Sequence, residues 1–356
     1  MSTALKIVLK IIAGLFALFL LAIFYIDFTS GRTSQIRDED GHILPGSIAE
    51  LEKVELGGME QWISIRGHDK NNPVLIWIHG GPGSTQMPLA HHLDHELEKE
   101  FVIVHWDQRG AGKSNPRGFD ESTMSLEQFK ADGLELIEYI LKRLDQEKVF
   151  LLGHSWGTCI GVELAAENPQ LIHAYIGVSQ VVNDQRAVQI AYDWLMEKAK
   201  EKNERERIEF LEELGEPPYR HNEYRQLASL VAEYGGNFDQ EIWRIALIVF
   251  DAPEYRVIDY YRLLGGMNRG GKPLHEEAML HFNYIETVPA LEMPTFFLVG
   301  AKDYNTPAEL VKKYYDLIEA PQKELIIFEE SAHTPFLKEP GRFYQTLIGI
   351  KTKLLD

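Results

Sequence analysis

The segment GHSWG, residues 153–157, has the residue types and spacing of a nucleophilic serine on a sharp turn. It follows the apolar run VFLL and opens the stretch Trp156–Glu167, which has the composition of a helix. A serine between a strand and a helix needs small residues two positions before and after it, because a tight turn leaves no room for larger side chains. The helix N-terminus also favours negative charge that develops on a substrate. The pattern therefore predicts Ser155 as a catalytic nucleophile.

A nucleophilic serine needs a general base, and the base needs an acid that orients it. Asp303 comes just after the apolar run TFFLV, and His333 comes just after the run ELIIF. Both lie beyond the carboxyl ends of expected strands, where open α/β sheets place their sites. His333 is also the only histidine after His281. We therefore predict Asp303 and His333 as the partners of Ser155.

The glycine-rich segment HGGPG, residues 79–83, follows the apolar run VLIWI. Acyl transfer requires two backbone N–H donors that point at the developing oxyanion. One donor should belong to Trp156, the residue after the nucleophile. The other should come from this loop, where glycines let the backbone approach a substrate without a Cβ atom. We assign that second donor to Gly81.

Other motifs in the sequence do not support a phosphate or metal site. The segment DQRGAGKS, residues 107–114, lacks the glycine spacing of a phosphate-binding loop, and we interpret it as a structural turn held by Asp107 and Arg109. Cys159 is expected to be a small core residue. The residues with the spacing of a helical metal site lie in a polar segment without a fixed carboxylate ligand, and we interpret them as a solvated helix: His91, His92 and His95.

Composition limits the possible classes of protein. The chain has 356 residues, of which 45% are hydrophobic, and 36 Lys and Arg against 54 Asp and Glu give a net charge of −18. This composition fits a folded globular protein and excludes disorder along the whole chain. The acidic balance argues against binding to nucleic acid, which requires a basic face. A single cysteine excludes a disulfide framework and a cysteine-built metal site.

The N-terminus differs from the rest of the chain. Residues 11–26 carry no charge, and extension to Ile7 gives twenty residues interrupted only by Lys10. About 20 apolar residues span a bilayer, so the sequence predicts a membrane anchor over residues 1–30 and a linker over 31–48. The lysines before the run favour a single-pass orientation with an extracytoplasmic catalytic domain. The alternatives are a cleaved signal peptide and a buried helix.

The rest of the chain alternates short apolar runs with helical patterns. This alternation predicts an α/β fold with a doubly wound, mostly parallel sheet. The core is expected over residues 49–182 and 287–356, and the interval 183–286 has helical stretches without a convincing buried strand, so it is expected to be a helical cap. The runs expected to be strands are residues 49–56, 59–66, 74–78, 101–105, 149–152, 171–178, 295–299 and 324–328.

The motifs HGGPG, DQRGAGKS, GHSWGT, GAKD and SAH occur in this order, and with them the chain resembles the α/β-hydrolase superfamily. HGGPG with DQRG resembles, more narrowly, the proline-iminopeptidase-like branch. The resemblance implies Ser155, Asp303 and His333 as the triad, Gly81 and Trp156 as oxyanion donors, and a cap domain over the site. It departs in the cap, where family members carry glutamates beside tryptophan that hold the substrate amine. The cap tryptophans here are followed by Leu and Arg: Trp194 and Trp243.

These observations together predict a membrane-anchored serine hydrolase that forms an acyl-enzyme and needs neither a cofactor nor a metal ion. Its substrates would be small molecules, and we favour an aminopeptidase-like hydrolase of short peptides or aminoacyl amides. The alternatives are a carboxylesterase or lipase-type enzyme, and an inactive hydrolase fold used for binding. One or two cap carboxylates that face the cavity would attract a substrate ammonium group, and the candidates are Glu197, Glu201, Glu233, Glu241, Asp251 and Glu254.

Overall fold

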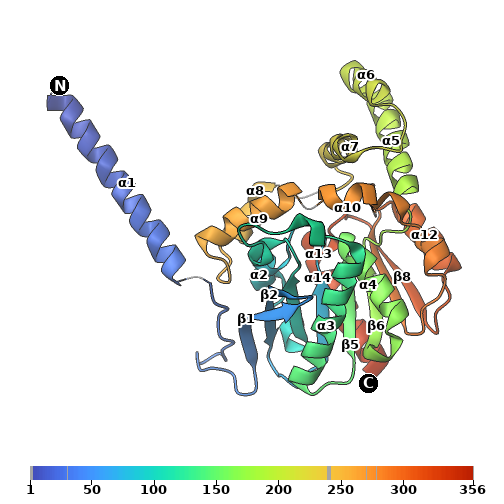
Figure 1. The fold of residues 1–356 in the computed structure, drawn as a ribbon, viewed down its shortest axis with the longest axis horizontal. Helices are drawn as coiled ribbons and strands as arrows, with labels where there is room; N and C mark the ends of the chain where they lie inside the picture. The colour runs from blue at the N-terminus through green and yellow to red at the C-terminus, as the bar shows by residue number, and fades with distance from the viewer. Residues whose placement is uncertain (1–2, 30, 239–241, 270, 278, 356) are drawn as a thin grey trace.

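A mostly parallel sheet forms the centre of the molecule (Figure 1). The computed structural model describes residues 3–29, 31–238, 242–269, 271–277 and 279–355. The sheet has eight strands in the order β1-β2-β4-β3-β5-β6-β7-β8. Strands β3 to β8 pair in parallel, whereas β1 and β2 form an antiparallel hairpin at one edge and β2 pairs antiparallel with β4. The predicted mostly parallel sheet is therefore confirmed.

The strands begin and end within two residues of the predicted runs. The central strands β3 and β5 are buried along their whole length, as expected for strands with helices on both faces. The strand bounds are β1 Ile48–Leu56, β2 Met59–Gly67, β3 Val74–Ile78, β4 Val102–Asp107, β5 Val149–His154, β6 Ile172–Val178, β7 Thr295–Gly300 and β8 Lys323–Phe328.

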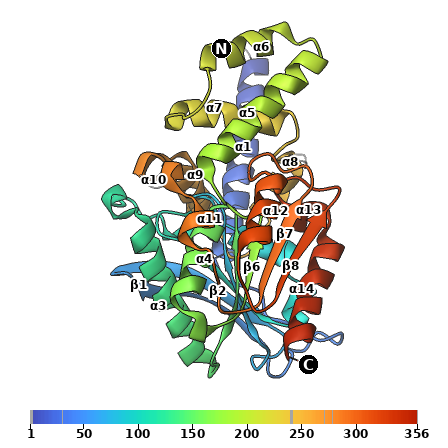
Figure 2. The same cartoon turned by 90° about the vertical axis from the view of Figure 1, so that its right-hand side faces the viewer.

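Helices cover both faces of the sheet (Figure 2). Alternate residues of β3 point to opposite faces, so Ile76 packs in a core with α3, α4 and α12, whereas Trp77 packs in a second core with α2, α13 and α14. Local signals position these helices; the Ser125 hydroxyl, for example, accepts a hydrogen bond from the Gln128 N–H and caps α3. The helix bounds are α2 Met87–Leu93, α3 Leu126–Leu144, α4 Trp156–Glu167, α12 Ala308–Leu317, α13 Pro335–Lys338 and α14 Pro340–Leu355.

The chain between β6 and β7 contains helices that lie beyond one end of the sheet (Figure 1). The charged stretch 187–213, expected as helical, forms two helices, α5 and α6, because Asn203 adopts a positive φ of 55° between them. Figure 1 shows α8, α9 and α10 across the upper end of the sheet, with α5 to α7 above them. The bounds are α5 Asp184–Glu201, α6 Arg205–Leu214, α7 His221–Glu233, α8 Ile242–Phe250, α9 Val257–Arg269, α10 Gly271–Glu277 and α11 Tyr284–Thr287.

The N-terminal segment forms the helix α1, Thr3–Thr29, which projects away from the sheet (Figure 1). Charged residues lie inside it near both ends: Lys6, Lys10 and Asp27. Within the part of the chain that the structure describes, no helix combines the length and the apolar character needed to cross a bilayer. The predicted membrane anchor, and the single-pass extracytoplasmic location that depended on it, are therefore wrong.

A buried ion pair ties the loop after β4 to α3. The Arg109 guanidinium donates from Nε and Nη2 to the two oxygens of Asp132, each at 2.9 Å. The side-chain amides of Gln61 and Gln128 also donate to Asp132, so this buried carboxylate is fully satisfied. The predicted structural turn is present after β4, where the Ala111 N–H donates to the Gln108 carbonyl oxygen at 2.8 Å and the Lys113 N–H donates to Asp107 Oδ2 at 2.7 Å.

Removal of one partner of this pair should destabilise the protein strongly. Asp132→Ala leaves the buried Arg109 guanidinium without its counter-ion, and such losses cost about 3–5 kcal/mol. We expect the free energy of unfolding in urea to fall by this amount. The matched control is Lys53→Met, which breaks the exposed Lys53–Glu60 pair and should cost less than about 1 kcal/mol. Equal effects of the two variants would contradict this account.

Candidate active site

Ser155 occupies the turn between β5 and α4 in a strained backbone conformation. Its φ of 51° and ψ of −122° lie outside the regions that non-glycine residues normally adopt. The turn is held because the Ser155 N–H donates to the Val178 carbonyl oxygen at 3.0 Å. A Cβ atom at Gly157 would lie 2.1 Å from the carbonyl oxygen of Ile78, so only glycine fits there. The spacing of GHSWG thus follows from close packing around the serine.

Asp303 and His333 form a buried pair in the loops after β7 and β8. His333 Nδ1 lies 2.8 Å from Asp303 Oδ2. The other oxygen of Asp303 accepts hydrogen bonds from the N–H groups of Asn305 and Thr306, each at 2.9 Å. Burial alone would raise the pKa of Asp303, but His333 and these hydrogen bonds outweigh it and hold that pKa below its usual value. An ionised Asp303 keeps the proton on His333 Nδ1 and leaves Nε2 as the base.

Three groups hold the backbone of His333, and the sequence analysis missed all of them. The His333 N–H donates to the Asn237 carbonyl oxygen at 2.9 Å. The His333 carbonyl oxygen accepts from His154 Nε2 and from the Ser179 hydroxyl, each at 3.0 Å. His154 is the variable residue before the serine in GHSWG, and Asn237 follows α7, so neither belongs to a fixed motif position.

The structure brings the three predicted triad residues to one place. Ser155 and His333 line the same cavity, and Asp303 lies behind His333. Within the described residues, no hydrogen bond joins His333 Nε2 to the Ser155 hydroxyl; Nε2 lies 3.2 Å from Asn305 Nδ2 instead. Catalytic hydrogen bonds often form only when a substrate is bound, so this arrangement is compatible with proton transfer from Ser155 to His333 Nε2.

The two predicted oxyanion donors lie beside Ser155. Gly81 has a positive φ of 133°, which favours glycine, and its N–H makes no hydrogen bond with the described residues. Trp156 is the first residue of α4, so its N–H has no acceptor within the helix. Both residues line a small cavity together with Ser155. Two unused backbone donors beside a serine are the arrangement that an oxyanion requires.

Gln108 connects the glycine-rich loop to the turn that carries the serine. Its backbone N–H donates to His79 Nε2 at 3.1 Å, and its side-chain amide donates to the His79 carbonyl oxygen at 2.9 Å. Its Oε1 accepts from Trp156 Nε1 at 3.1 Å. The segment DQRGAGKS therefore braces the site, a role that its sequence did not reveal. The presence of both HGGPG and DQRG, each directly after an apolar run, was the available signal.

His79 and His154, two buried histidines near Ser155, are neutral. Burial lowers the pKa of His79 to about 4, and it lowers the pKa of His154 to about 3, with a further contribution from His333. His79 Nδ1 donates to the Gly80 carbonyl oxygen at 2.7 Å, so its Nε2 remains the acceptor for Gln108. These imidazoles act as fixed hydrogen-bonding groups because burial prevents their protonation.

Two cavities share Ser155 and Gly81 on their walls. The smaller has a volume of about 40 Å³ and is also lined by Cys159, which is buried as expected. The larger has a volume of about 440 Å³ and is also lined by His333. Tyr224, on α7, borders both. A substrate that reaches Ser155 can therefore place one part in each cavity.

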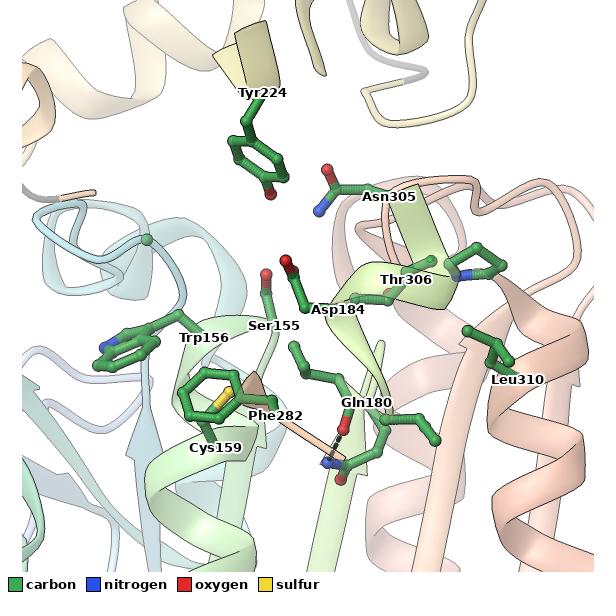
Figure 3. Close-up of a pocket in the computed structure, with 15 residues that line it drawn as sticks. Ser155, Trp156, Cys159, Gln180, Asp184, Tyr224, Phe282, Asn305, Thr306 and Leu310 are labelled. Carbon is green, nitrogen blue, oxygen red and sulfur yellow. Dashed lines mark hydrogen bonds between the residues drawn. The ribbon is translucent and has the colours of Figure 1, made fainter. Parts of the chain in front are cut away.

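Asp184 is the carboxylate in the smaller cavity. Figure 3 shows its carboxyl end directed, like the Ser155 hydroxyl, toward the space below Tyr224. Its side chain is buried, Oδ2 has no hydrogen-bond partner, and burial raises the pKa of Asp184 to about 7. The described members of the predicted carboxylate set line neither cavity, and Glu241 lies outside the described residues. Sequence reasoning missed Asp184 because no motif surrounds it.

Comparisons with known proteins agree with this geometry. Residues 73–340 match the family model described as alpha/beta hydrolase fold. The chain is 34% identical to a Bacillus subtilis protein named probable aminopeptidase YbaC, over 85% of this chain and 96% of that protein. It is 26% identical to a proline iminopeptidase from Heyndrickxia coagulans, over 81% and 93%. A solved proline iminopeptidase-related protein from Thermus thermophilus shares the fold, with a TM-score of 0.60 at 20% identity over 86% of this chain and 99% of that one.

The neutral histidines predict a loss of stability in acid. Below pH 6.5 the unfolded chain binds protons at these imidazoles and the folded chain does not. Their contribution to the free energy of unfolding is therefore fully present above pH 6.5, and it is lost as the pH falls towards 4 for His79 and 3 for His154. Each imidazole contributes up to about 1.4 kcal/mol per pH unit. The raised pKa of Asp184 acts in the opposite direction, so wild type is compared with His154→Gln by urea unfolding at several pH values. The variant should lose less stability per pH unit, and parallel curves would contradict the prediction.

Proposed function

The chain belongs to the α/β-hydrolase fold family, in its proline-iminopeptidase-like branch, and on that premise we propose that it is a serine aminopeptidase. It is a hydrolase, and its proposed substrates are aminoacyl amides and short peptides with a free N-terminal amine. The observation that carries the proposal is the buried, unpartnered carboxylate of Asp184 in the cavity next to Ser155. The names of the relatives support the same class of reaction.

The proposed first half-reaction uses the triad. Ser155 Oγ attacks the scissile carbonyl carbon while His333 Nε2 accepts the hydroxyl proton. Asp303 stays ionised, fixes the tautomer of His333 through the 2.8 Å contact and stabilises the imidazolium. His333 then donates the proton to the leaving amine, and the carbon–nitrogen bond breaks to give an acyl-enzyme.

The proposed oxyanion site and the second half-reaction complete the cycle. The N–H groups of Gly81 and Trp156 donate to the oxygen of the tetrahedral intermediate, where such donors are worth about 3–4 kcal/mol each. Water then attacks the acyl-enzyme, His333 accepts its proton and returns one to Ser155 Oγ. The acid product leaves with its amine still protonated, and no cofactor takes part in these steps.

Asp184 is proposed to bind the substrate amine. In an α-aminoacyl group the amine nitrogen lies only two bonds from the carbonyl carbon that Ser155 attacks. A group that recognises it must therefore lie in the compartment directly beside Ser155, where Asp184 lies. A buried carboxylate without a partner is costly, and a substrate ammonium would supply the missing counter-ion. Such a ligand would account for an acidic residue at the first position of α5 that has no partner of its own.

Free and N-acetylated substrates test this proposal. We expect kcat/KM for alanine p-nitroanilide to exceed that for its N-acetyl derivative by about 100-fold, since a desolvated ion pair is worth a few kcal/mol. Asp184→Asn should reduce this ratio by at least about tenfold. The matched control is Asp193→Asn, an exposed carboxylate on the same helix, which should leave the ratio unchanged. The ionisation of His333 affects both substrates equally and cancels in the ratio. The ratio should therefore rise through pH 7 as Asp184 ionises and fall above the amine pKa of about 8.

The same assay distinguishes the carboxylesterase alternative. Equal rates on free and acetylated amides, together with much faster cleavage of simple acyl esters, would decide for an esterase. Absence of turnover on all of these substrates would favour the inactive, binding fold.

A further inference from the structure

The larger cavity has an apolar wall with no carboxylate among its described lining residues. Its volume is about 440 Å³, within the range of small-molecule sites. Arg225, an exposed residue of α7, is the one permanently charged side chain among those residues. The apolar wall comes from α8, α9 and α13, through Ile245, Val249, Leu263, Met267, Phe336 and Leu337. Such a wall favours a neutral apolar group over a cationic one, because it offers a cation no counter-charge.

The position of His333 shows which part of a substrate would occupy this cavity. The general acid must reach the leaving atom in order to protonate it. His333 lines the larger cavity and does not line the smaller one, whereas Asp184 and Trp156 line only the smaller. On the basis of the proposed function, we propose that the larger cavity binds the leaving group and that preferred substrates join a small aminoacyl group to a bulky apolar leaving group.

The size of the smaller cavity limits the aminoacyl part. Its volume is about 40 Å³, and its lining includes Phe282 and Leu310, which lie lower than Asp184 and to its left and right in Figure 3. A small side chain such as that of alanine matches this space better than a large aromatic one. The site is therefore asymmetric, with a small compartment that contains one carboxylate for the acyl part and a wide apolar one for the group that leaves.

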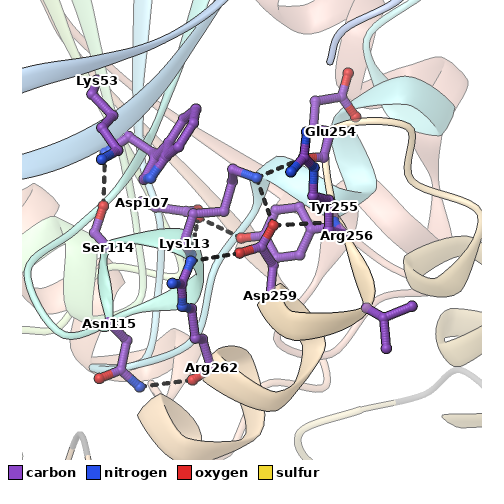
Figure 4. A network of polar contacts seen from close by, with 12 residues as sticks. Lys53, Asp107, Lys113, Ser114, Asn115, Glu254, Tyr255, Arg256, Asp259 and Arg262 are labelled. Carbon is purple, nitrogen blue, oxygen red and sulfur yellow. Dashed lines mark hydrogen bonds and ion pairs between the residues drawn. The ribbon is translucent and has the colours of Figure 1, made fainter. Parts of the chain in front are cut away.

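A buried polar network holds the apolar wall in place (Figure 4). Lys113, from the loop after β4, donates to Asp259 Oδ2 at 2.7 Å and to the Glu254 carbonyl oxygen at 2.8 Å. Asn115 donates to the Arg262 carbonyl oxygen at 2.7 Å. These contacts fix α9 to the same loop that braces the oxyanion donors. The wall formed by α9 is thus already in place before a leaving group binds.

Alanyl dipeptide amides with different leaving groups test the assignment in the full-length protein. The probes are Ala-Phe-NH2, Ala-Gly-NH2 and Ala-Lys-NH2, which share the acyl part and differ only beyond the scissile bond. We expect kcat/KM for the phenylalanine amide to exceed that for the glycine amide by at least about tenfold, the usual gain from filling an apolar pocket. The lysine amide should not share this gain.

A negative charge placed on the wall of the larger cavity should reduce the preference for the phenylalanine amide over the lysine amide. Met267 lines the cavity, whereas Leu264 lies on the same helix outside it, and the side chains are 55% and 61% exposed. Either position therefore tolerates a polar residue without loss of core packing. Met267→Glu should reduce the Phe-to-Lys ratio of kcat/KM by at least about tenfold, whereas Leu264→Glu, which adds the same charge outside the cavity, should change it by less than about twofold.

The outcomes separate this inference from the proposed function. Similar rates for the phenylalanine and glycine amides, or equal effects of the two variants, would overturn the assignment of the cavity while leaving the aminopeptidase intact. If only esters are cleaved, the proposed function fails, and benzyl acetate against methyl acetate then tests the same cavity. Calorimetry can measure the affinity of the protein for the two leaving groups without turnover, and phenylalaninamide should bind more tightly than glycinamide. Equal affinities would also overturn the inference.

Discussion

The lack of space around the turn at Ser155 is the constraint on which the rest of the site depends. A Cβ atom at Gly157 would lie 2.1 Å from the Ile78 carbonyl oxygen, and one at Gly80 would lie 3.0 Å from His154 Nδ1. The start of α4 is therefore pressed against the end of β3 and the loop that follows it. This contact places the N–H groups of Gly81 and Trp156 beside the serine and forces Ser155 into its positive φ. The strain is maintained because neighbouring strands fix the turn on both sides.

Hydrogen bonds between neutral groups, rather than charges, hold the loops around this turn. His79 and His154 stay neutral through burial, and each uses its ring nitrogens to fix a loop. Buried charges are paired, as in Asp303 with His333 and Arg109 with Asp132. Among the described carboxylates, Asp94, Asp184 and Glu254 each have one buried oxygen without a partner, but of these three only Asp184 lines a cavity that also contains Ser155. A costly group left unsatisfied beside a nucleophile is readily explained by a ligand that satisfies it.

Much of the fold could be predicted from the sequence because its signals are local. The apolar runs located β3 to β8 to within two residues, and the composition of residues 156–167 located α4. Gln108, Asn237 and Asp184 could not be found in this way, because their roles depend on contacts between segments far apart in the chain. The N-terminal prediction, which rested on the length and apolar character of residues 7–26 and on the lysines near their start, was wrong, because no described helix has the length and apolar character of a membrane span.

Covalent labelling tests most directly the central claim that Ser155 is the nucleophile. The protein is treated with a fluorophosphonate, and the modified peptide is identified by mass spectrometry. We expect a single phosphonylated residue, Ser155, with labelling lost in Ser155→Ala and retained in Ser84→Ala, which alters another serine on the wall of the larger cavity. Undiminished labelling of the Ser155→Ala variant, or modification of a different residue in the wild type, would contradict the account.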